Sequence, residues 1–429
     1  MTHASLYPVS DLVWNGESFA QSIDLAREQD IASALRGLKG HFALHQELPS
    51  GEHILARDPL GVNKLFFAFE SDGSVISSNF LLDLLCRGIP TASIYSVPSG
   101  HYVVVNPRSR ELRLERYVQL GFGEDREVSL PELGASIRKA LEETFAALGK
   151  SLDGRPTYVT LSGGLDSTLI AALAKRYVPG LRAVTFKLAG EDTEDVLFAR
   201  RVAESLDIPL EVVTFDASEI ELLLDTVLVY GQDWRDFNVH CGLVNAAIGS
   251  TLGERHADGA RPVVLTGDTM NELMADYLPV TYRGRVYYEL PRMSAERLRR
   301  FLVAGLDSGD REVGIFARFG VDTVQPYALC ASAYAGIPGA LLESEDAKAS
   351  LARAVAADLI PAFVFDRPKV RAQVGSSESV GGTLAALVDR GIDAHELEQR
   401  FSSLFGLDPK ELSRLIRAGF YRFTSTYPR

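Results

Sequence analysis

The sequence has few cysteines, no long apolar run and no excess of basic residues. Its three cysteines, Cys86, Cys241 and Cys330, lie far apart without metal-ligand spacing, which argues against a disulfide framework and is typical of a reducing cytoplasm. We expect each of them to be a small buried hydrophobic residue. No apolar run approaches the roughly 18 residues that cross a membrane. The opening segment Met1-Thr2-His3-Ala4 does not begin a signal peptide.

The charge balance is acidic, because 57 Asp and Glu residues outnumber 44 Lys and Arg residues and the net charge is −13. Nucleic-acid binding requires a basic surface, so nucleic acid is not expected as a partner. Hydrophobic residues make up 46% of the 429-residue chain and charged residues 24%, which is typical of a globular protein with two or three domains. We therefore expect a cytoplasmic protein that acts on small molecules, and self-association stays open.

The most informative segment is Leu161-Ser162-Gly163-Gly164-Leu165-Asp166-Ser167. An apolar run precedes it and an Ala-rich run follows, which predicts a strand, a tight turn and a helix. Paired glycines let backbone N–H groups converge at the positive end of the helix, and this arrangement suits pyrophosphate. Ser162 and Ser167 add hydroxyl donors, and Asp166 can serve phosphate only through Mg²⁺. The alternative is an ordinary turn in which Ser or Asp caps the helix; no Lys follows the glycines, so this is no P-loop.

The chain predicts two regions. The first 120 or so residues contain short apolar runs separated by turn residues and read as β-rich, and residues 121–126 are a plausible linker. Ser129 and Glu132 have capping-box spacing at the start of a new helix. Strands predicted at 157–161, 182–187, 210–215 and 262–266 alternate with helices that begin near Asp166, Thr193 and Ala217, which indicates a parallel sheet covered on both faces. After about residue 290 the sequence reads as mostly helical.

A second loop follows the last of these strands and runs from Thr266 to Glu272. In a parallel sheet it would open on the same edge as the first loop. Asp268 and Glu272 could then face the reacting phosphate, through Mg²⁺ or as a base for an incoming amine. Taken alone, such residues more often form turns.

The two loops together resemble the synthetase domain of the asparagine synthetase family, in which S-G-G-L-D-S is followed by G-E-G-[SA]-D-E. Residues 320–327 resemble its G-L-E-x-R-x-P-F segment, and Asp366-Arg367-Pro368-Lys369 resembles its R-x-K motif. The resemblance implies a doubly wound ATP-pyrophosphatase fold, with Lys369 stabilising charge at the acyl-adenylate. The ATP and pyrophosphate contacts that it implies are Leu161, Ser162, Gly163, Gly164, Asp166, Ser167, Thr185, Gly267 and Lys369. The implied Mg²⁺ ligands are Asp166, Asn271 and Glu272.

The amino-terminal region resembles the glutaminase domain of the same family, through residues 40–44, 57–67 and 96–101. The resemblance implies an Ntn-type α+β domain over residues 1–122, followed by the synthetase domain over 123–429. A working glutaminase uses a cysteine at the mature amino terminus, where this sequence has Thr2. Cys86 lies in an apolar run and cannot replace it. We interpret the domain as a degenerate remnant; Thr2 as an alternative nucleophile is conceivable.

The segment 367–377 also resembles the late motif of the β-lactam and carbapenam synthetases, which lack glutaminase activity and close a ring with an amine of the substrate itself. Those enzymes use a Tyr–Glu pair to take the amine proton. By position, Asp310 corresponds to the acid, although it could equally form a surface ion pair, and Asp268 replaces the tyrosine. Asn271 stands where the family has a Mg²⁺-binding aspartate, and an amide is the weaker ligand.

We therefore predict an AMP-forming amide synthetase that uses ATP and Mg²⁺ to join a small-molecule carboxylate to an amine in specialised-metabolite biosynthesis, for example of an antibiotic. Its candidate catalytic residues are Lys369, Asp268 and Asp310. Candidate substrate contacts are Asp233, Asp236 and Tyr277, each of which could equally make an ordinary surface or core contact. The alternatives are an asparagine synthetase-like enzyme that uses free ammonia or ammonia from a separate glutaminase, and a non-catalytic scaffold.

Overall fold

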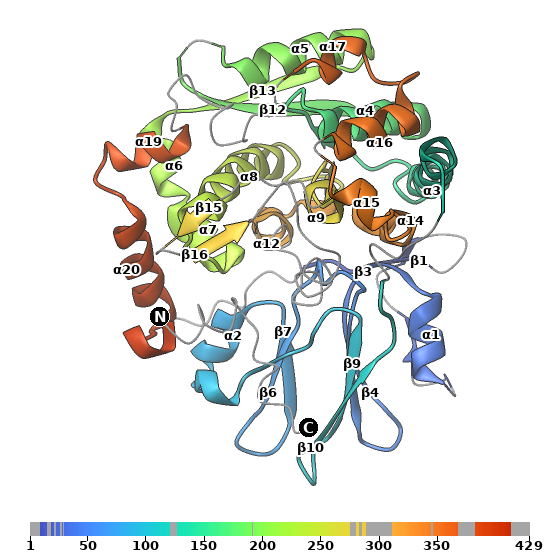
Figure 1. Cartoon of the computed structure of the whole chain (residues 1–429). Helices are drawn as coiled ribbons and strands as arrows, with labels where there is room; N and C mark the ends of the chain where they lie inside the picture. Colours follow the sequence, from blue (N-terminus) through green and yellow to red (C-terminus); the bar gives the residue numbers. More distant parts are fainter. Residues whose placement is uncertain are drawn as a thin grey trace.

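A computed structural model describes most of the chain, and Figure 1 shows its arrangement in two halves. The residues described are 9–14, 19–20, 23–25, 28, 30–120, 127–190, 192–274, 280–282, 285–288, 311–344, 346–367 and 382–412. Antiparallel strands from the first 120 residues fill the lower half of Figure 1, and a parallel sheet with its helices fills the upper half. None of the described helices has the length and apolar character that a membrane span requires.

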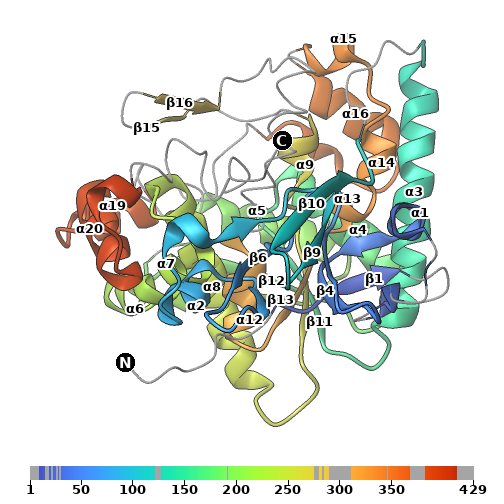
Figure 2. The ribbon, with the colours of Figure 1, turned by 90° about the horizontal axis from the view of Figure 1, so that it is seen from below.

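The amino-terminal region folds into three small antiparallel sheets, as its alternating apolar runs predict. The largest has the order β10-β9-β5-β4 and lies in front of the parallel sheet in the view from below (Figure 2). The strands are β1 (Leu12–Trp14), β2 (Phe19–Ala20), β3 (Lys39–His41), β4 (Ala43–Glu47), β5 (His53–Arg57), β6 (Phe66–Phe69), β7 (Val75–Ser78), β8 (Tyr95–Ser96), β9 (His101–Asn106) and β10 (Glu111–Arg116). The helices are α1 (Ile31–Gly37), α2 (Leu81–Cys86) and the 3₁₀ turn η2 (Thr91–Ser93).

The second region begins with α3 (Leu130–Ser151), where the predicted capping box is confirmed: Ser129 accepts from the backbone N–H of Glu132, whose side chain accepts from Ser129 N. The boundary predicted at residues 122 and 123, like the linker, lies outside the described residues. The parallel sheet that follows contains β11 (Thr157–Thr160), β12 (Arg182–Leu188), β13 (Leu210–Phe215), β14 (Val263–Leu265) and β17 (Asp322–Val324).

This five-stranded sheet has the order β13-β12-β11-β14-β17, and every neighbouring pair is parallel. The strands predicted at 157–161, 182–187, 210–215 and 262–266 are confirmed to within two residues at each end. The helices α4 (Leu165–Tyr177), α5 (Glu194–Ser205) and α6 (Ala217–Leu222) begin where predicted. Helix α5 and helix α8 (Asp236–Arg255) lie on opposite faces of β12 and β13 (Figure 1), so the sheet is covered on both sides.

The remaining elements surround this sheet. They are α7 (Leu224–Gly231), α9 (Met270–Met274), β15 (Val280–Tyr282), β16 (Arg285–Tyr288), α12 (Val313–Arg318), α13 (Pro326–Leu329), α14 (Ala331–Tyr334), α15 (Gly339–Leu342), α16 (Ala347–Ala356), α17 (Ala362–Phe365), α19 (Thr383–Val388) and α20 (Ala394–Phe405). The predicted helical character after residue 290 holds for the described part of the chain, with β17 as the exception.

The two regions are joined by a shared apolar core and by buried hydrogen bonds. Phe80, Leu81 and Leu84 pack in the same cluster as the apolar residues of the parallel sheet. Gln232, at the end of α7, accepts from the backbone N–H of Leu81 at 2.7 Å and donates to the carbonyl of Asn79 at 2.9 Å. The antiparallel region is therefore packed firmly against the region of the parallel sheet.

The expectation that every cysteine is buried was wrong for one of them. Cys86 is exposed because it is the last residue of α2, whose buried face carries Leu81 and Leu84. Cys330 is buried and Cys241 is half-buried, and all three are free thiols.

A buried histidine in α8 makes the stability depend on pH. His240 is 1% exposed, and neither ring nitrogen has a hydrogen-bond partner among the described residues. Burial lowers its pKa to about 3. In the unfolded chain the imidazole has its ordinary pKa of about 6.5 and binds a proton below that pH, whereas the folded chain keeps the ring neutral down to about pH 3. The free energy of unfolding therefore falls as the pH falls through this range.

Between pH 7 and pH 5, we expect the free energy of unfolding to fall by about 2 kcal/mol less in His240→Leu than in the native protein. Urea unfolding at the two pH values measures this difference. His395→Leu, at an exposed position in α20, is the control and should leave the pH dependence unchanged. An unaltered pH dependence in His240→Leu would contradict the assignment.

Candidate active site

The first loop connects β11 to α4 in a conformation that only glycine adopts easily. Gly163 has φ +73°, and a Cβ atom there would lie 2.5 Å from Cβ of Phe198 in α5. Inside the loop, Ser162 Oγ accepts from the backbone N–H of Gly164 at 3.3 Å and lies 3.2 Å from Ser167 Oγ. The hydroxyl groups therefore hold the turn in shape at the start of α4.

The second loop packs directly against the first, as the parallel arrangement predicted. β14 is paired with β11, so the residues after both strands meet at one edge of the sheet. A Cβ on Gly267 would lie 2.8 Å from the backbone nitrogen of Ser167 and 3.0 Å from the carbonyl carbon of Asp166. Glycine at this position is what allows the two loops to touch.

A lysine that the sequence analysis did not single out lies between the two loops. Lys348 Nζ, from the first turn of α16, is 2.6 Å from Asp166 Oδ2 and 2.6 Å from Asn271 Oδ1. The hydroxyl of Tyr327 donates to the backbone carbonyl of Asp166 at 2.9 Å. Asp166 Oδ1 is buried and receives no hydrogen bond from the described residues. The carboxylate is thus fixed in place, with one oxygen left for a ligand.

The three predicted Mg²⁺ ligands do not form a metal-binding set. Lys348 neutralises Asp166 and binds the amide oxygen of Asn271, while Glu272 is fully buried and pairs with Arg311 at 3.2 Å. In the described part of the chain, no three His, Cys, Asp or Glu side chains are grouped to hold a metal ion. The Lys348 ammonium group, bound to one oxygen of Asp166 and to the amide oxygen of Asn271, repels a divalent cation at the same point. These residues therefore do not fit Mg²⁺ held by the protein.

Two carboxyl groups form a pair, one from the second loop and one from the residue before α12. Asp268, 27% exposed, is hydrogen-bonded to Glu312, which is 3% exposed and precedes α12. Glu312 Oε2 accepts from the Gln325 amide at 2.7 Å and from the Thr266 hydroxyl at 2.9 Å. Arg311 lies 3.6 Å from Asp268 Oδ1. Asp310, the acid expected from the sequence, lies outside the described residues; Glu312, two positions later, makes the contact with Asp268.

The surroundings push the pKa values of the two carboxyl groups apart. Burial raises the pKa of Glu312 well above its ordinary value, and the neighbouring charge of Asp268 raises it further. Burial also opposes ionisation of Asp268, but Arg311, the hydrogen bond from Glu312 and Lys348 together lower the pKa of Asp268. The opposite directions of the two shifts favour a proton on Glu312, which can donate it in a hydrogen bond to the Asp268 carboxylate.

Arg367, the first residue of the late motif, anchors the first loop. Its guanidinium group donates to the backbone carbonyl of Ser162 at 2.8 Å and to Asp195 in α5 at 2.5 Å, and it lies 4.4 Å from the ring centre of Phe198. Burial raises the pKa of Asp195 to about 6 despite this ion pair. Lys369, two residues further on, lies outside the described residues.

The other predicted site residues are placed as follows. Leu161 is buried at the start of the first loop, and Thr185 is buried in β12. Asp233 is buried and ion-paired with Arg235, and it accepts from the Asn238 amide at 2.6 Å, so its carboxylate is already bound within the protein. Asp236 begins α8 and is half-buried. Tyr277 lies outside the described residues.

The amino-terminal region reaches the carboxyl pair through one histidine. His41 Nε2, in β3, is 3.3 Å from the backbone carbonyl of Gln325, whose side chain binds Glu312. Burial lowers the pKa of His41 to about 4, so the ring is neutral at pH 7 and donates from Nε2. The antiparallel region therefore helps to position Gln325.

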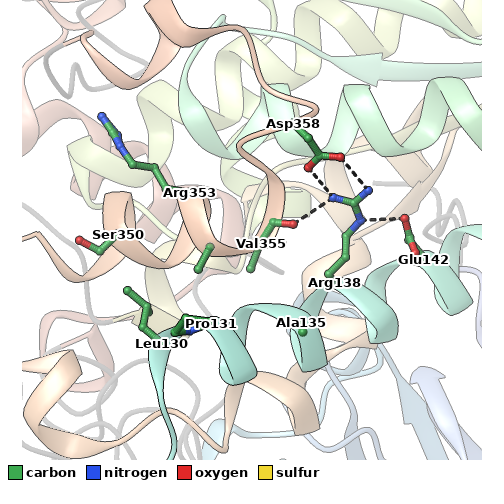
Figure 3. A pocket seen from close by; sticks show the side chains of 10 residues that line it. Leu130, Pro131, Ala135, Arg138, Glu142, Ser350, Arg353, Val355 and Asp358 are labelled. Carbon is green, nitrogen blue, oxygen red and sulfur yellow. Dashed lines mark hydrogen bonds and ion pairs between the residues drawn. The ribbon is translucent and has the colours of Figure 1, made fainter.

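A hollow of about 760 Å³ lies between α3 and α16 (Figure 3). The guanidinium group of Arg138 lies in it and is held by Glu142, Asp358 and the carbonyl of Val355. No residue of the two loops lines it. Its importance to the site is indirect, because these contacts fix the helix that carries Lys348.

One family of known proteins matches this chain over a region that includes both loops. Residues 137–310 match the sequence model of the family described as "Asparagine synthase". The chain is 29% identical over 247 residues to a probable glutamine-hydrolysing asparagine synthetase of Schizosaccharomyces pombe, covering 52% of this chain and 42% of that protein. It is 26% identical over 248 residues to the glutamine-hydrolysing asparagine synthetase of Homo sapiens, covering 52% and 43%.

The matched region thus spans about two fifths of the length of these two curated relatives. Among solved structures, a glutamine-dependent NAD⁺ synthetase from Acinetobacter baumannii in complex with ADP is similar at 17% identity and a TM-score of 0.34, covering 78% of this chain and 53% of that one. At this TM-score the similarity is too low to bear on the fold or the site.

Proposed function

We propose, from the premise that residues 137–310 belong to the asparagine synthetase family, that the chain is an ATP-dependent carbon–nitrogen ligase. Its substrates in this proposal are a small-molecule carboxylate and an amine, and its products are an amide, AMP and pyrophosphate. The supporting observation is the contact between the two loops, where Gly267 lies against Ser167. That contact brings the carboxyl pair of the second loop to the pyrophosphate loop.

In the first step, a carboxylate oxygen of the substrate attacks the α-phosphorus of ATP, and the bond to the β-phosphate oxygen breaks. Pyrophosphate leaves into the loop of Ser162 to Ser167, where backbone N–H groups and the start of α4 favour negative charge. The buried Arg367 holds the loop carbonyl of Ser162, so this cradle is preformed. Lys369, by analogy with the family motif, stabilises the charge that develops at the acyl-adenylate.

In the second step, the amine nitrogen attacks the acyl carbon, and the bond from that carbon to the AMP oxygen breaks. The nitrogen must lose a proton, and Asp268 is the half-buried carboxylate, with a lowered pKa, that we place to take it. Glu312 stays protonated beneath it and orients its oxygen atoms. We propose that the product is a specialised metabolite, formed with an amine of the same molecule or of a second one.

Isotope exchange between ATP and pyrophosphate tests the first step. We expect exchange with at least one carboxylate from a panel of amino acids and related acids, before any second amine is added. Addition of ammonium or of single amines then identifies the nucleophile by product mass, with AMP formed in equal amount. Formation of ADP and phosphate would contradict the AMP-forming reaction. ATP binding without exchange for any carboxylate would favour the scaffold alternative. Product with ammonium alone would favour the asparagine synthetase-like alternative.

A further inference from the structure

Lys348 is an unusual residue for the first turn of a helix. The start of α16 carries partial positive charge, which opposes a cation there. The side chain is nevertheless 13% exposed and directed at Asp166, with its ammonium 2.6 Å from that carboxylate and 2.6 Å from the Asn271 amide oxygen. The two oxygen atoms compensate for a placement that the helix itself disfavours.

The position of α16 is fixed by close packing on α3. A Cβ atom on Gly134 would lie 2.6 Å from the backbone carbonyl oxygen of Ala354, so the two helices touch through their backbones. Arg138 donates to the carbonyl of Val355 at 3.0 Å and to Asp358, just beyond the helix (Figure 3). Lys348 is therefore presented to the loops by a rigid element and not by a side chain free to swing away.

The charges at this point favour one built-in cation over a bound one. Asp166 contributes one negative charge, Asn271 contributes none, and Lys348 cancels the first. A divalent cation here would have to displace the ammonium or lie beside it, which would place three positive charges next to Asp166, with Asp268 as a further carboxylate within electrostatic range of Lys348. The departing pyrophosphate, in contrast, gains from a cation that is already in place.

We propose that the Lys348 ammonium takes the place of a protein-held divalent cation at the pyrophosphate loop. Asp166 and Asn271 hold the ammonium there, and it neutralises pyrophosphate without a metal ion held by these two side chains. This inference rests on the proposed function of the loop. It explains why an amide suffices at Asn271: the side chain accepts a hydrogen bond from an ammonium group, which needs no second negative charge.

Calorimetric titration with inorganic pyrophosphate, in EDTA and in excess Mg²⁺, tests the inference. We expect the dissociation constant of the native protein to differ by less than about threefold between the two conditions. Lys348→Met should weaken binding in EDTA by about 10- to 100-fold, because a charge-assisted hydrogen bond is lost. Lys139→Met removes an exposed lysine of α3 that pairs only loosely with Glu143 at 3.8 Å, and it should bind as the native protein does.

In the double variant Lys348→Met with Asn271→Asp, pyrophosphate binding should depend on Mg²⁺ instead of on the lysine ammonium. With two carboxylates and no ammonium, we expect tight pyrophosphate binding only in Mg²⁺, and one bound Mn²⁺ detectable by electron paramagnetic resonance. Native binding that requires Mg²⁺ would overturn the inference and leave the proposed function intact. If the native protein binds pyrophosphate neither in EDTA nor in Mg²⁺, both the inference and the proposed function are overturned, so the two failures give different results. Circular dichroism of each variant confirms that it is folded.

Discussion

Asp268→Asn is expected to slow amide formation by about a thousandfold while ATP–pyrophosphate exchange stays within a few-fold of the native rate. Loss of a general base costs typically 10²- to 10⁴-fold, and the proton is transferred only in the second step. Adenylation needs no base, because the substrate carboxylate is already ionised at neutral pH. The asparagine side chain keeps the size of the aspartate and can still accept a hydrogen bond from Arg311.

Glu312→Gln is the matched partner of this variant. The glutamine amide can donate to Asp268 as the protonated Glu312 does, and its oxygen can still accept from Gln325 and Thr266. We therefore expect Glu312→Gln to retain amide formation to within about tenfold, whereas Asp268→Asn does not. The opposite ranking would make Glu312 the base, and equal exchange and amide losses in Asp268→Asn would place Asp268 in adenylation instead.

Rapid-quench measurement of the two steps separates these outcomes. Exchange reports adenylation, and a single turnover from preformed acyl-adenylate reports attack by the amine. Glu343→Gln, at an exposed position at the end of α15, is the control and should change neither rate.

The pairing of the two loops could be predicted from the sequence because parallel strands have only one carboxyl edge. Each loop follows a short apolar strand, β11 or β14, and each ends in a helix. Once alternation indicated a parallel sheet, the loops had to open on the same edge, and Gly267 against Ser167 confirms that they meet. β17 was not predicted as a strand, because its three residues Asp322–Val324 are too few for a periodic signal.

The partners of the loop residues could not be predicted, because they come from distant segments. Glu312 and Asp310 lie in the same short charged run, and nothing in the sequence indicates that Glu312 contacts Asp268. Lys348 is separated from Asp166 by 182 positions, and its helix looked merely rich in alanine. One signal was available: a lysine in the first turn of a helix opposes the helix dipole, which indicates that a compensating anion lies nearby.

Gly163→Ala is expected to destabilise the protein by about 3 kcal/mol and to reduce ATP–pyrophosphate exchange by more than about a hundredfold. The positive φ of +73° alone costs a non-glycine residue about 1–2 kcal/mol. The new Cβ would also lie 2.5 Å from Phe198 Cβ and 2.6 Å from the Phe198 carbonyl carbon. This carbon is part of the backbone of α5 and cannot move away without distorting the helix. The loop must move, and a displacement of about 1 Å at a reacting site can cost about a hundredfold in rate.

Gly164→Ala, one residue further on, is the matched control for stability. Gly164 has φ −76°, and an added Cβ would meet only Ser162 Oγ, at 3.3 Å, among the described atoms around it. We therefore expect its free energy of unfolding to change by less than about 1 kcal/mol. Urea unfolding compares the two variants, and isotope exchange is measured on Gly163→Ala under conditions where it is fully folded. If Gly163→Ala unfolds and exchanges like the native protein, the loop does not depend on this close contact with α5, and the preformed pyrophosphate cradle is refuted.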